Sequence, residues 1–182
     1  MVKIRYTSRM DPQKLLFVAE HETGEEIMVK FSKTYSFEAH QYYSDRLIAP
    51  ELFLYKGLVG GWKMVVMEPM DIERCAVYAD RHQDCDIPFP QAAQVHTTLE
   101  NAVETLHSGG FVHGDIHNTN LLVKMDGGSG VLIVDFDWAG KAGEIRYPMH
   151  VNRVNVARPE GARGGCFIMP EHDVEMVDIM FR

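Results

Sequence analysis

The chain has 182 residues, 46% of them hydrophobic and 24% charged, so it can bury a core and is neither disordered nor a fibrous repeat. Its formal charge of −8 argues against a nucleic-acid-binding protein, which would neutralise phosphates with lysine and arginine. No apolar run approaches the roughly 20 residues that cross a bilayer, and three cysteines are few for a disulfide scaffold. We therefore expect a soluble, cytoplasmic protein with neither a nucleic-acid nor a membrane partner.

The first third of the chain has the composition of β-structure. Residues 14–20 and 26–31 are rich in β-branched and aromatic side chains, and Gly24 in the polar stretch between them suits a hairpin turn. Ser36 is placed to cap a helix over residues 37–47, which ends before Pro50 because the residue preceding proline avoids helical geometry. Residues 51–55 and 62–67 are two further strand candidates.

The pattern changes after a polar breaker at residues 68–71, and the stretch up to Pro90 is charged and irregular. Residues 91–107 are the clearest helix, because their apolar side chains recur at three- and four-residue steps, and Gly109 and Gly110 end it. Short strands at 121–124 and 131–136 and a helical segment at 171–181 follow. This order predicts an α+β, two-lobed fold, with a β-rich small lobe over residues 1–70 and a compact large lobe over residues 71–182.

The densest polar cluster lies between the long helix and the strand at 121–124. It is the run His113-Gly114-Asp115-Ile116-His117-Asn118-Thr119-Asn120, and Asp135 and Asp137 close the next apolar run. A hairpin with polar residues at both ends brings Asp115, Asn120 and Asp135 together. Carboxylate and amide oxygens are the ligands that Mg²⁺ prefers beside phosphates, and a carboxylate free of metal can accept a proton from an attacking hydroxyl. These residues therefore predict phosphoryl transfer.

The same residues carry a resemblance to a known family. His113-Gly114-Asp115 with Asn120 resembles the catalytic loop of the protein-kinase-like fold, and Asp135-Phe136-Asp137 resembles its metal-binding DFG element. With a second histidine at position 117, the loop is nearer to aminoglycoside and choline phosphotransferases than to typical protein kinases. The resemblance covers roughly residues 14–181. The combination of residues 37–40, residues 49–52 and the tail from residues 145–148 to residues 171–173 is similar to compact kinase-like proteins of fungi.

The resemblance implies an ATP- and Mg²⁺-dependent phosphotransferase that passes the γ-phosphoryl group to a hydroxyl acceptor. By position, Asp115 would be the catalytic base, while Asn120 and Asp135 would hold the metal. Asp137 stands where the family has glycine, and it either adds a metal ligand or is a solvated carboxylate.

The small lobe supplies the expected nucleotide-binding residues. Ile27-Met28-Val29-Lys30 resembles the VAIK strand, so Lys30 would pair with the phosphates and with Glu38 on the following helix. Residues 67–70 resemble the hinge, where the backbone of Glu68 and Met70 would accept the adenine edge. The glycine-rich phosphate loop of the family has no counterpart, because residues 9–13 contain no glycine.

Two features leave alternatives open. Only about 45 residues follow the DFD element, so the helical large lobe is truncated and a protein acceptor is less expected than in a full kinase. The stretch after this element is basic, which predicts either ordinary loop charge or a guanidinium surface for an acidic or phosphorylated acceptor. The alternatives to a kinase are a pseudokinase that acts as a nucleotide-binding or scaffolding module, and a nucleotidyl transferase.

Overall fold

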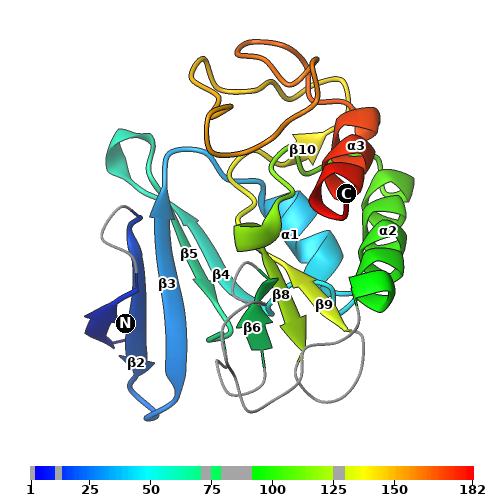
Figure 1. The fold of residues 1–182 in the computed structure, drawn as a ribbon. Coiled ribbons are helices and arrows are strands. Elements are labelled where there is room, and N and C mark those ends of the chain that lie inside the picture. The colour runs from blue at the N-terminus through cyan, green and yellow to red at the C-terminus, as the bar shows by residue number, and fades with distance from the viewer. Residues whose placement is uncertain (1–2, 11–13, 71–74, 79–91, 125–129) are drawn as a thin grey trace.

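The computed structural model describes residues 3–10, 14–70, 75–78, 92–124 and 130–182. A five-stranded antiparallel sheet forms one part of the molecule, and two long helices with a smaller sheet form the other (Figure 1). This is the α+β arrangement predicted from the sequence. The expected boundary at residues 70 and 71 stays a prediction, because residues 71–74 lie outside the described part, as does most of the charged stretch before Pro90.

The large sheet contains β1 (Ile4–Arg9), β2 (Leu16–His21), β3 (Glu26–Ser32), β4 (Leu52–Gly57) and β5 (Lys63–Met67), in the order β1-β2-β3-β5-β4. The centre of the sheet is β3, so Lys30 is flanked by Leu16 on β2 and Val65 on β5. The hairpin between β2 and β3 turns at Gly24, whose φ of 87° suits glycine. The edge strand β1 was not predicted, because most of its side chains are polar and exposed on both faces.

Helix α1 (Phe37–Ser44) crosses between the two parts of the molecule. The Ser36 side chain caps it by accepting a hydrogen bond from the Ala39 amide, as expected. The helix ends three residues before the predicted end at residue 47, because Leu47 adopts a left-handed conformation with φ of 60°. The Ile48 amide then donates back to the Tyr43 carbonyl, which closes the helix end.

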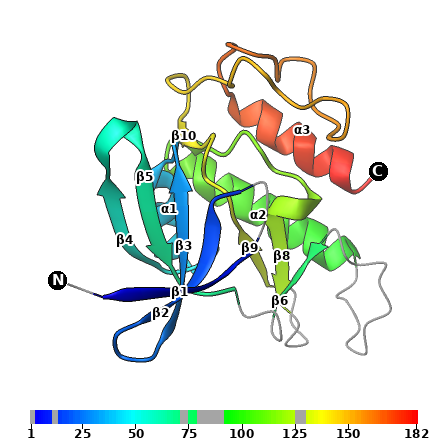
Figure 2. The same cartoon turned by 90° about the vertical axis from the view of Figure 1, so that its left-hand side faces the viewer.

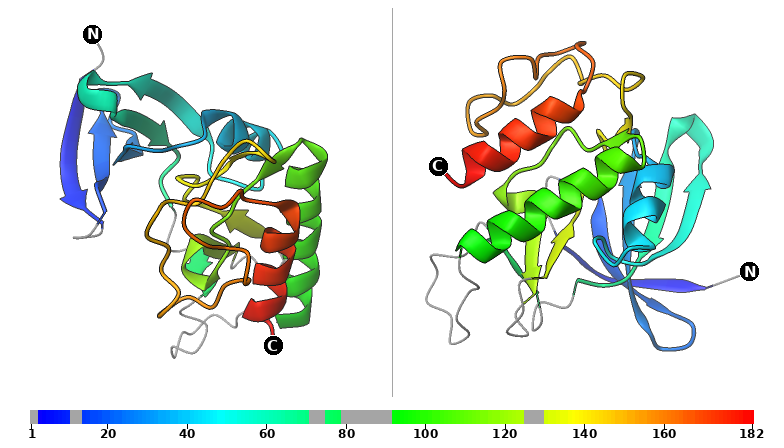
Figure 3. Two further views of the ribbon diagram at one scale, coloured as in Figure 1. Left: turned by 90° about the horizontal axis from the view of Figure 1, so that it is seen from above. Right: turned by 90° about the vertical axis from the view of Figure 1, so that its right-hand side faces the viewer.

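The second part of the molecule is built on α2 (Ala92–Ser108), which matches the helix predicted from periodicity. Its buried face, including Leu99 and Leu106, packs on a three-stranded sheet of β6 (Cys75–Val77), β8 (Leu121–Lys124) and β9 (Val131–Ile133). Helix α3 (Pro170–Met180) runs alongside α2 (Figures 2 and 3). Both helices contact the short strand β7 (Phe111–Val112), which pairs with β10 (Gly140–Lys141). Strand β9 is shorter than the strand predicted over residues 131–136. It ends at Ile133 because Val134 begins the turn that carries the acidic residues.

One apolar cluster joins these elements and fixes where the polar loops lie. Phe136 is 1% exposed and packs among residues from α1, α2, β8 and β9, and the Tyr43 hydroxyl donates to the Ala102 carbonyl across α1 and α2. The segment after β9 is therefore held between the two parts of the molecule. In this position, its acidic residues face the central strand β3 of the large sheet.

Candidate active site

A buried carboxylate on α3 holds the loop between β7 and β8, residues 113–120, by hydrogen bonds to its backbone. Asp173 is 0% exposed and accepts hydrogen bonds from the backbone amides of His113, at 2.8 Å, and Gly114, at 2.7 Å. His107 Nε2 lies 3.1 Å from the same carboxylate. Gly114 has φ of 77°, which strains any residue with a side chain, and a Cβ there would also lie 2.7 Å from the Ile168 side chain. Sequence reasoning missed Asp173, since nothing in its local pattern distinguishes it from a solvated helix residue.

The expected base, Asp115, is held by three neighbours. One oxygen of its carboxylate accepts from Arg158 Nη2 at 2.5 Å, and the other accepts from the Asn120 side chain at 3.2 Å. His117 Nε2 lies 3.5 Å from the first oxygen. Burial raises the pKa of Asp115, but His117 and Arg158 outweigh it, so the pKa lies below its ordinary value. The carboxylate is therefore ionised at neutral pH, as a proton acceptor must be.

Asp135 lies opposite this loop and pairs with two lysines from the large sheet. Lys30 Nζ is 2.5 Å from Oδ1 and Lys14 Nζ is 2.6 Å from Oδ2. Burial opposes ionisation, but these two ammonium groups hold the pKa of Asp135 well below its usual range. Asp135 also has a left-handed backbone, with φ of 72°, which is unusual for a residue other than glycine and is typical of functional sites.

The predicted ion pair between Lys30 and Glu38 is not formed. Glu38 is exposed on the first turn of α1, and the second carboxylate beside Lys30 is that of Asp137, at 2.7 Å. On α1 it is His40 that points into the protein: its side chain is buried and its ring stacks on Phe136 with centroids 4.7 Å apart. The aspartate at position 137 thus takes the place expected for Glu38. Burial raises the pKa of Asp137, and Asp135 adds to this, while Lys30 lowers it.

A cleft of about 270 Å³ extends from these charged groups between the two parts of the molecule. Met67, Met70 and Leu122 contribute to its apolar walls, and Lys30 and Asp135 line its polar end. The cleft is also lined by Lys14, Asn120, Leu16, Met28 and Val134. An apolar slot with a charged end is a suitable shape for a nucleotide, whose base is flat and whose phosphates are anionic.

The structure brings most, but not all, of the predicted residues together. Lys30, Met70, Asn120 and Asp135 line one cleft, and Asp115 joins them through the Asn120 side chain. Glu68 lies outside the cleft lining and pairs with Glu51: its amide donates to the Glu51 carbonyl, and its carboxylate accepts from the Glu51 amide. The roles of these residues, including those of Glu38 and Glu68, stay predictions.

Each of the four arginines in the basic stretch after the DFD element has a partner within the fold. Arg153 donates to the carbonyls of Pro159 and Ala162, and Arg146 donates to the Gly165 carbonyl. Arg163 pairs with Glu160 of its own segment, and Arg158 is turned inward to Asp115. The described arginines of this stretch therefore hold the fold of the loop, and they give no support to the expectation of an acidic or phosphorylated acceptor.

The comparisons with known proteins agree with this geometry. A family model described as the phosphotransferase enzyme family (APH) matches residues 41–142, which is more than half of the chain. The Cydia pomonella granulovirus kinase PK-1 has a similar structure, with a TM-score of 0.72 and 16% identity over 98% of this chain and 67% of that one. Vaccinia related kinase 3 gives a TM-score of 0.65 and 14% identity over 99% of this chain and 63% of that one.

The chain thus spans about two thirds of the length of these two kinases, and at such low identity the likeness concerns the fold. A search of curated protein sequences finds no significant match. Among the described helices, none is long and apolar enough to cross a membrane. The two-lobed kinase-like fold expected from the sequence is confirmed, and the chain belongs to the phosphotransferase enzyme family.

Proposed function

We propose that this protein transfers the γ-phosphoryl group of ATP to a hydroxyl acceptor and requires Mg²⁺. The observation that carries the proposal is the pair of lysines, Lys14 and Lys30, that meet the two oxygens of Asp135 at the polar end of an apolar cleft. Two ammonium groups beside a carboxylate suit the phosphates and the metal of a nucleotide.

The donor set fits Mg²⁺. Every hydrogen bond that the Asn120 side chain makes with the described residues uses its nitrogen, so among them the amide oxygen is available as a ligand. Asp135 is ionised at neutral pH, the state in which a carboxylate binds a hard cation. When bound, Mg²⁺ neutralises charge on the phosphates. Lys14 and Lys30 would leave Asp135 for the phosphate oxygens, and Asp115 would accept the proton of the attacking hydroxyl.

Lys14 supplies what the missing glycine-rich loop would otherwise provide. It stands just before β2, and Asp135 holds its ammonium group at the polar end of the cleft. Burial lowers the pKa of Lys14, but its contact with Asp135 outweighs this and raises the pKa above its ordinary value, so the group stays charged. The sequence contained no signal for this role, because Lys14 resembles any exposed lysine at the start of a strand.

Replacing Lys14 by alanine should raise the KM for MgATP about tenfold, with kcat changed less than about threefold, since one charge-assisted phosphate contact is lost. Steady-state kinetics at varied ATP measure this split. Lys33→Ala is the matched control, because Lys33 is exposed and lies over the Trp62 ring away from the cleft. An unchanged KM in the Lys14 variant would remove Lys14 from the nucleotide site.

One observation favours the alternative of a catalytically inactive binding module. Arg158 is buried and its guanidinium forms a salt bridge with one carboxylate oxygen of Asp115, so the expected base already has a partner. Incubation with MgATP and a panel of hydroxyl compounds, followed by mass spectrometry, separates the candidates. We expect one compound to gain the mass of a phosphate. A gain of a nucleoside monophosphate would indicate a nucleotidyl transferase. Nucleotide binding with no modified compound would favour the binding module.

A further inference from the structure

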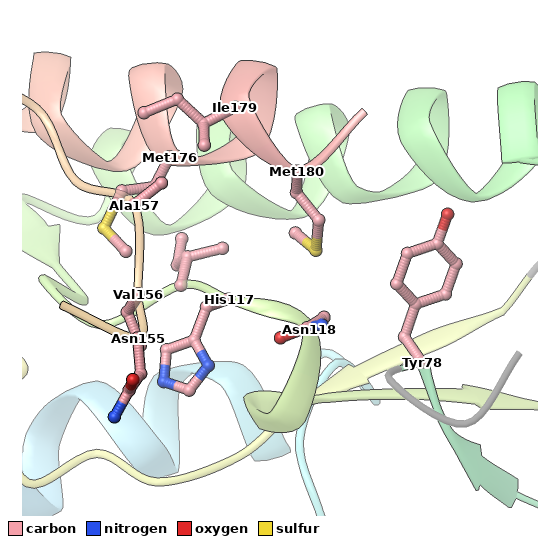
Figure 4. Close-up of a pocket in the computed structure, with 10 residues that line it drawn as sticks. Tyr78, His117, Asn118, Asn155, Val156, Ala157, Met176, Ile179 and Met180 are labelled. Carbon is pink, nitrogen blue, oxygen red and sulfur yellow. The ribbon is translucent and has the colours of Figure 1, made fainter. Parts of the chain in front are cut away.

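A second pocket, of about 290 Å³, lies on the other side of the catalytic loop from the cleft. It is lined by α3, by residues 116–118 of the loop, by residues 155–157 of the long segment that follows the DFD element, and by Tyr78. Figure 4 shows Met176 and Met180 reaching from α3 toward the loop, with Asn155 and His117 at one end and Tyr78 at the other. Nothing in the proposed nucleotide site uses this pocket.

The pocket shares a wall with the expected base. His117 lines the pocket, and its Nε2 atom lies 3.5 Å from Asp115 Oδ1 and 3.1 Å from the Asn120 side-chain nitrogen. The nucleotide cleft is lined by Thr119 and Asn120 of the same loop. One short loop thus lies between the two cavities. Asp115 contacts a lining residue of each, Asn120 of the cleft and His117 of the pocket, so its carboxylate lies between the proposed acceptor and the phosphate donor.

The lining of the pocket is amphipathic, and the imidazole of His117 is its one basic group. None of the ten described residues that line it is an aspartate, glutamate, lysine or arginine. Apolar contact comes from α3, mainly Met176, Ile179 and Met180, and hydrogen-bonding groups come from Asn118 and Asn155. The nearby guanidinium of Arg158 is neutralised by Asp115. Burying an unpaired charge is costly, so such a pocket selects against a charged ligand.

We propose that this pocket binds the acceptor, and that the acceptor is an uncharged molecule with an apolar portion and a hydroxyl group. The inference rests on the proposed phosphotransferase function and narrows its substrate class. In the step, the acceptor oxygen forms a bond to the γ-phosphorus as the bond from that phosphorus to the β–γ bridging oxygen breaks. ADP leaves with the electron pair, and the hydroxyl proton passes to Asp115.

Methionine methyl NMR tests the pocket and the cleft separately in the full chain. Met176 and Met180 line the pocket, whereas Met28 and Met67 line the cleft. The probes are octanediol, amino-octanol and hydroxyoctanoate, which share one eight-carbon chain and differ in charge. We expect octanediol to shift the methyl signals of Met176 and Met180, with a Kd about tenfold lower than either charged probe. MgATP should shift those of Met28 and Met67.

A pocket-filling variant gives the activity readout. Ile179→Trp should abolish the octanediol-induced shifts and reduce phosphoryl transfer to octanediol about tenfold or more. Val174→Trp, on an exposed face of the same helix, should leave both unchanged. Absence of octanediol shifts at Met176 and Met180 in the wild-type chain, or equal binding of a charged probe, overturns the inference even if Ile179→Trp does not fold. If MgATP leaves Met28 and Met67 unmoved, it is the proposed function that fails.

Discussion

Replacing Asp115 by asparagine is expected to lower kcat about 10³-fold while the Kd for MgATP changes less than about threefold. Proton acceptance by a positioned base contributes roughly 10²- to 10⁴-fold, and the amide of asparagine cannot accept the proton. Nucleotide binding should be retained because Lys14 and Lys30 form their ion pairs with Asp135, not with Asp115. Single-turnover kinetics with calorimetric titration of MgATP measure the two quantities independently.

The pH profile provides a second check on the same residue. Because the pKa of Asp115 lies below its ordinary value, the acidic limb of kcat/KM should not be set by Asp115 above about pH 4. Asp45→Asn is the control, since Asp45 is exposed and its carboxylate accepts a hydrogen bond from Gln41 of α1. A variant at Asp115 that turns over at the wild-type rate would exclude it as the base.

Replacing Asp173 by alanine should cost about 3–5 kcal/mol of unfolding free energy, which is a large share of the roughly 5–15 kcal/mol of a typical domain. The change leaves the buried amides of His113 and Gly114 without an acceptor, and each unsatisfied group costs about 1–3 kcal/mol. Urea unfolding of the two proteins measures the difference.

Two variants on α3 make this result specific. Asp173→Asn retains an acceptor oxygen and should lose less than half as much as Asp173→Ala. Glu175→Ala changes an exposed acidic residue two positions away and should stay within about 0.5 kcal/mol of the wild type. A loss of under about 1 kcal/mol in Asp173→Ala would mean that the carboxylate does not hold the catalytic loop.

The sequence predicted most reliably those elements whose residues are close together along the chain. The apolar spacing of α2 predicted a helix that lies within one residue of the observed one. The polar run from His113 to Asn120 and the turn at Asp135 were both found, because turns that follow short buried strands keep their polar residues together. The strand that carries Lys30 was predicted, and the structure places this lysine in the lining of the cleft.

The residues that sequence reasoning missed act through long-range contacts. Lys14 and Asp135 are 121 positions apart, and Arg158 lies 43 positions beyond Asp115, so no local spacing relates them. The expected pair of Lys30 with Glu38 is not formed in the structure, for a related reason. Which carboxylate reaches the lysine depends on how α1 packs, and α1 presents His40 to Phe136 and leaves Glu38 exposed.

The most direct test of the proposed nucleotide site is the thermal midpoint of the chain with and without MgATP, for the wild type and for Asp135→Asn. Ligand at about 100 times its Kd stabilises a fold by about 2.7 kcal/mol. For a chain of this size, we expect a rise of about 5–10 °C that requires Mg²⁺ and is lost in the variant. An unchanged midpoint in the wild type, or an equal rise in both proteins, would contradict a metal–nucleotide site at Asp135.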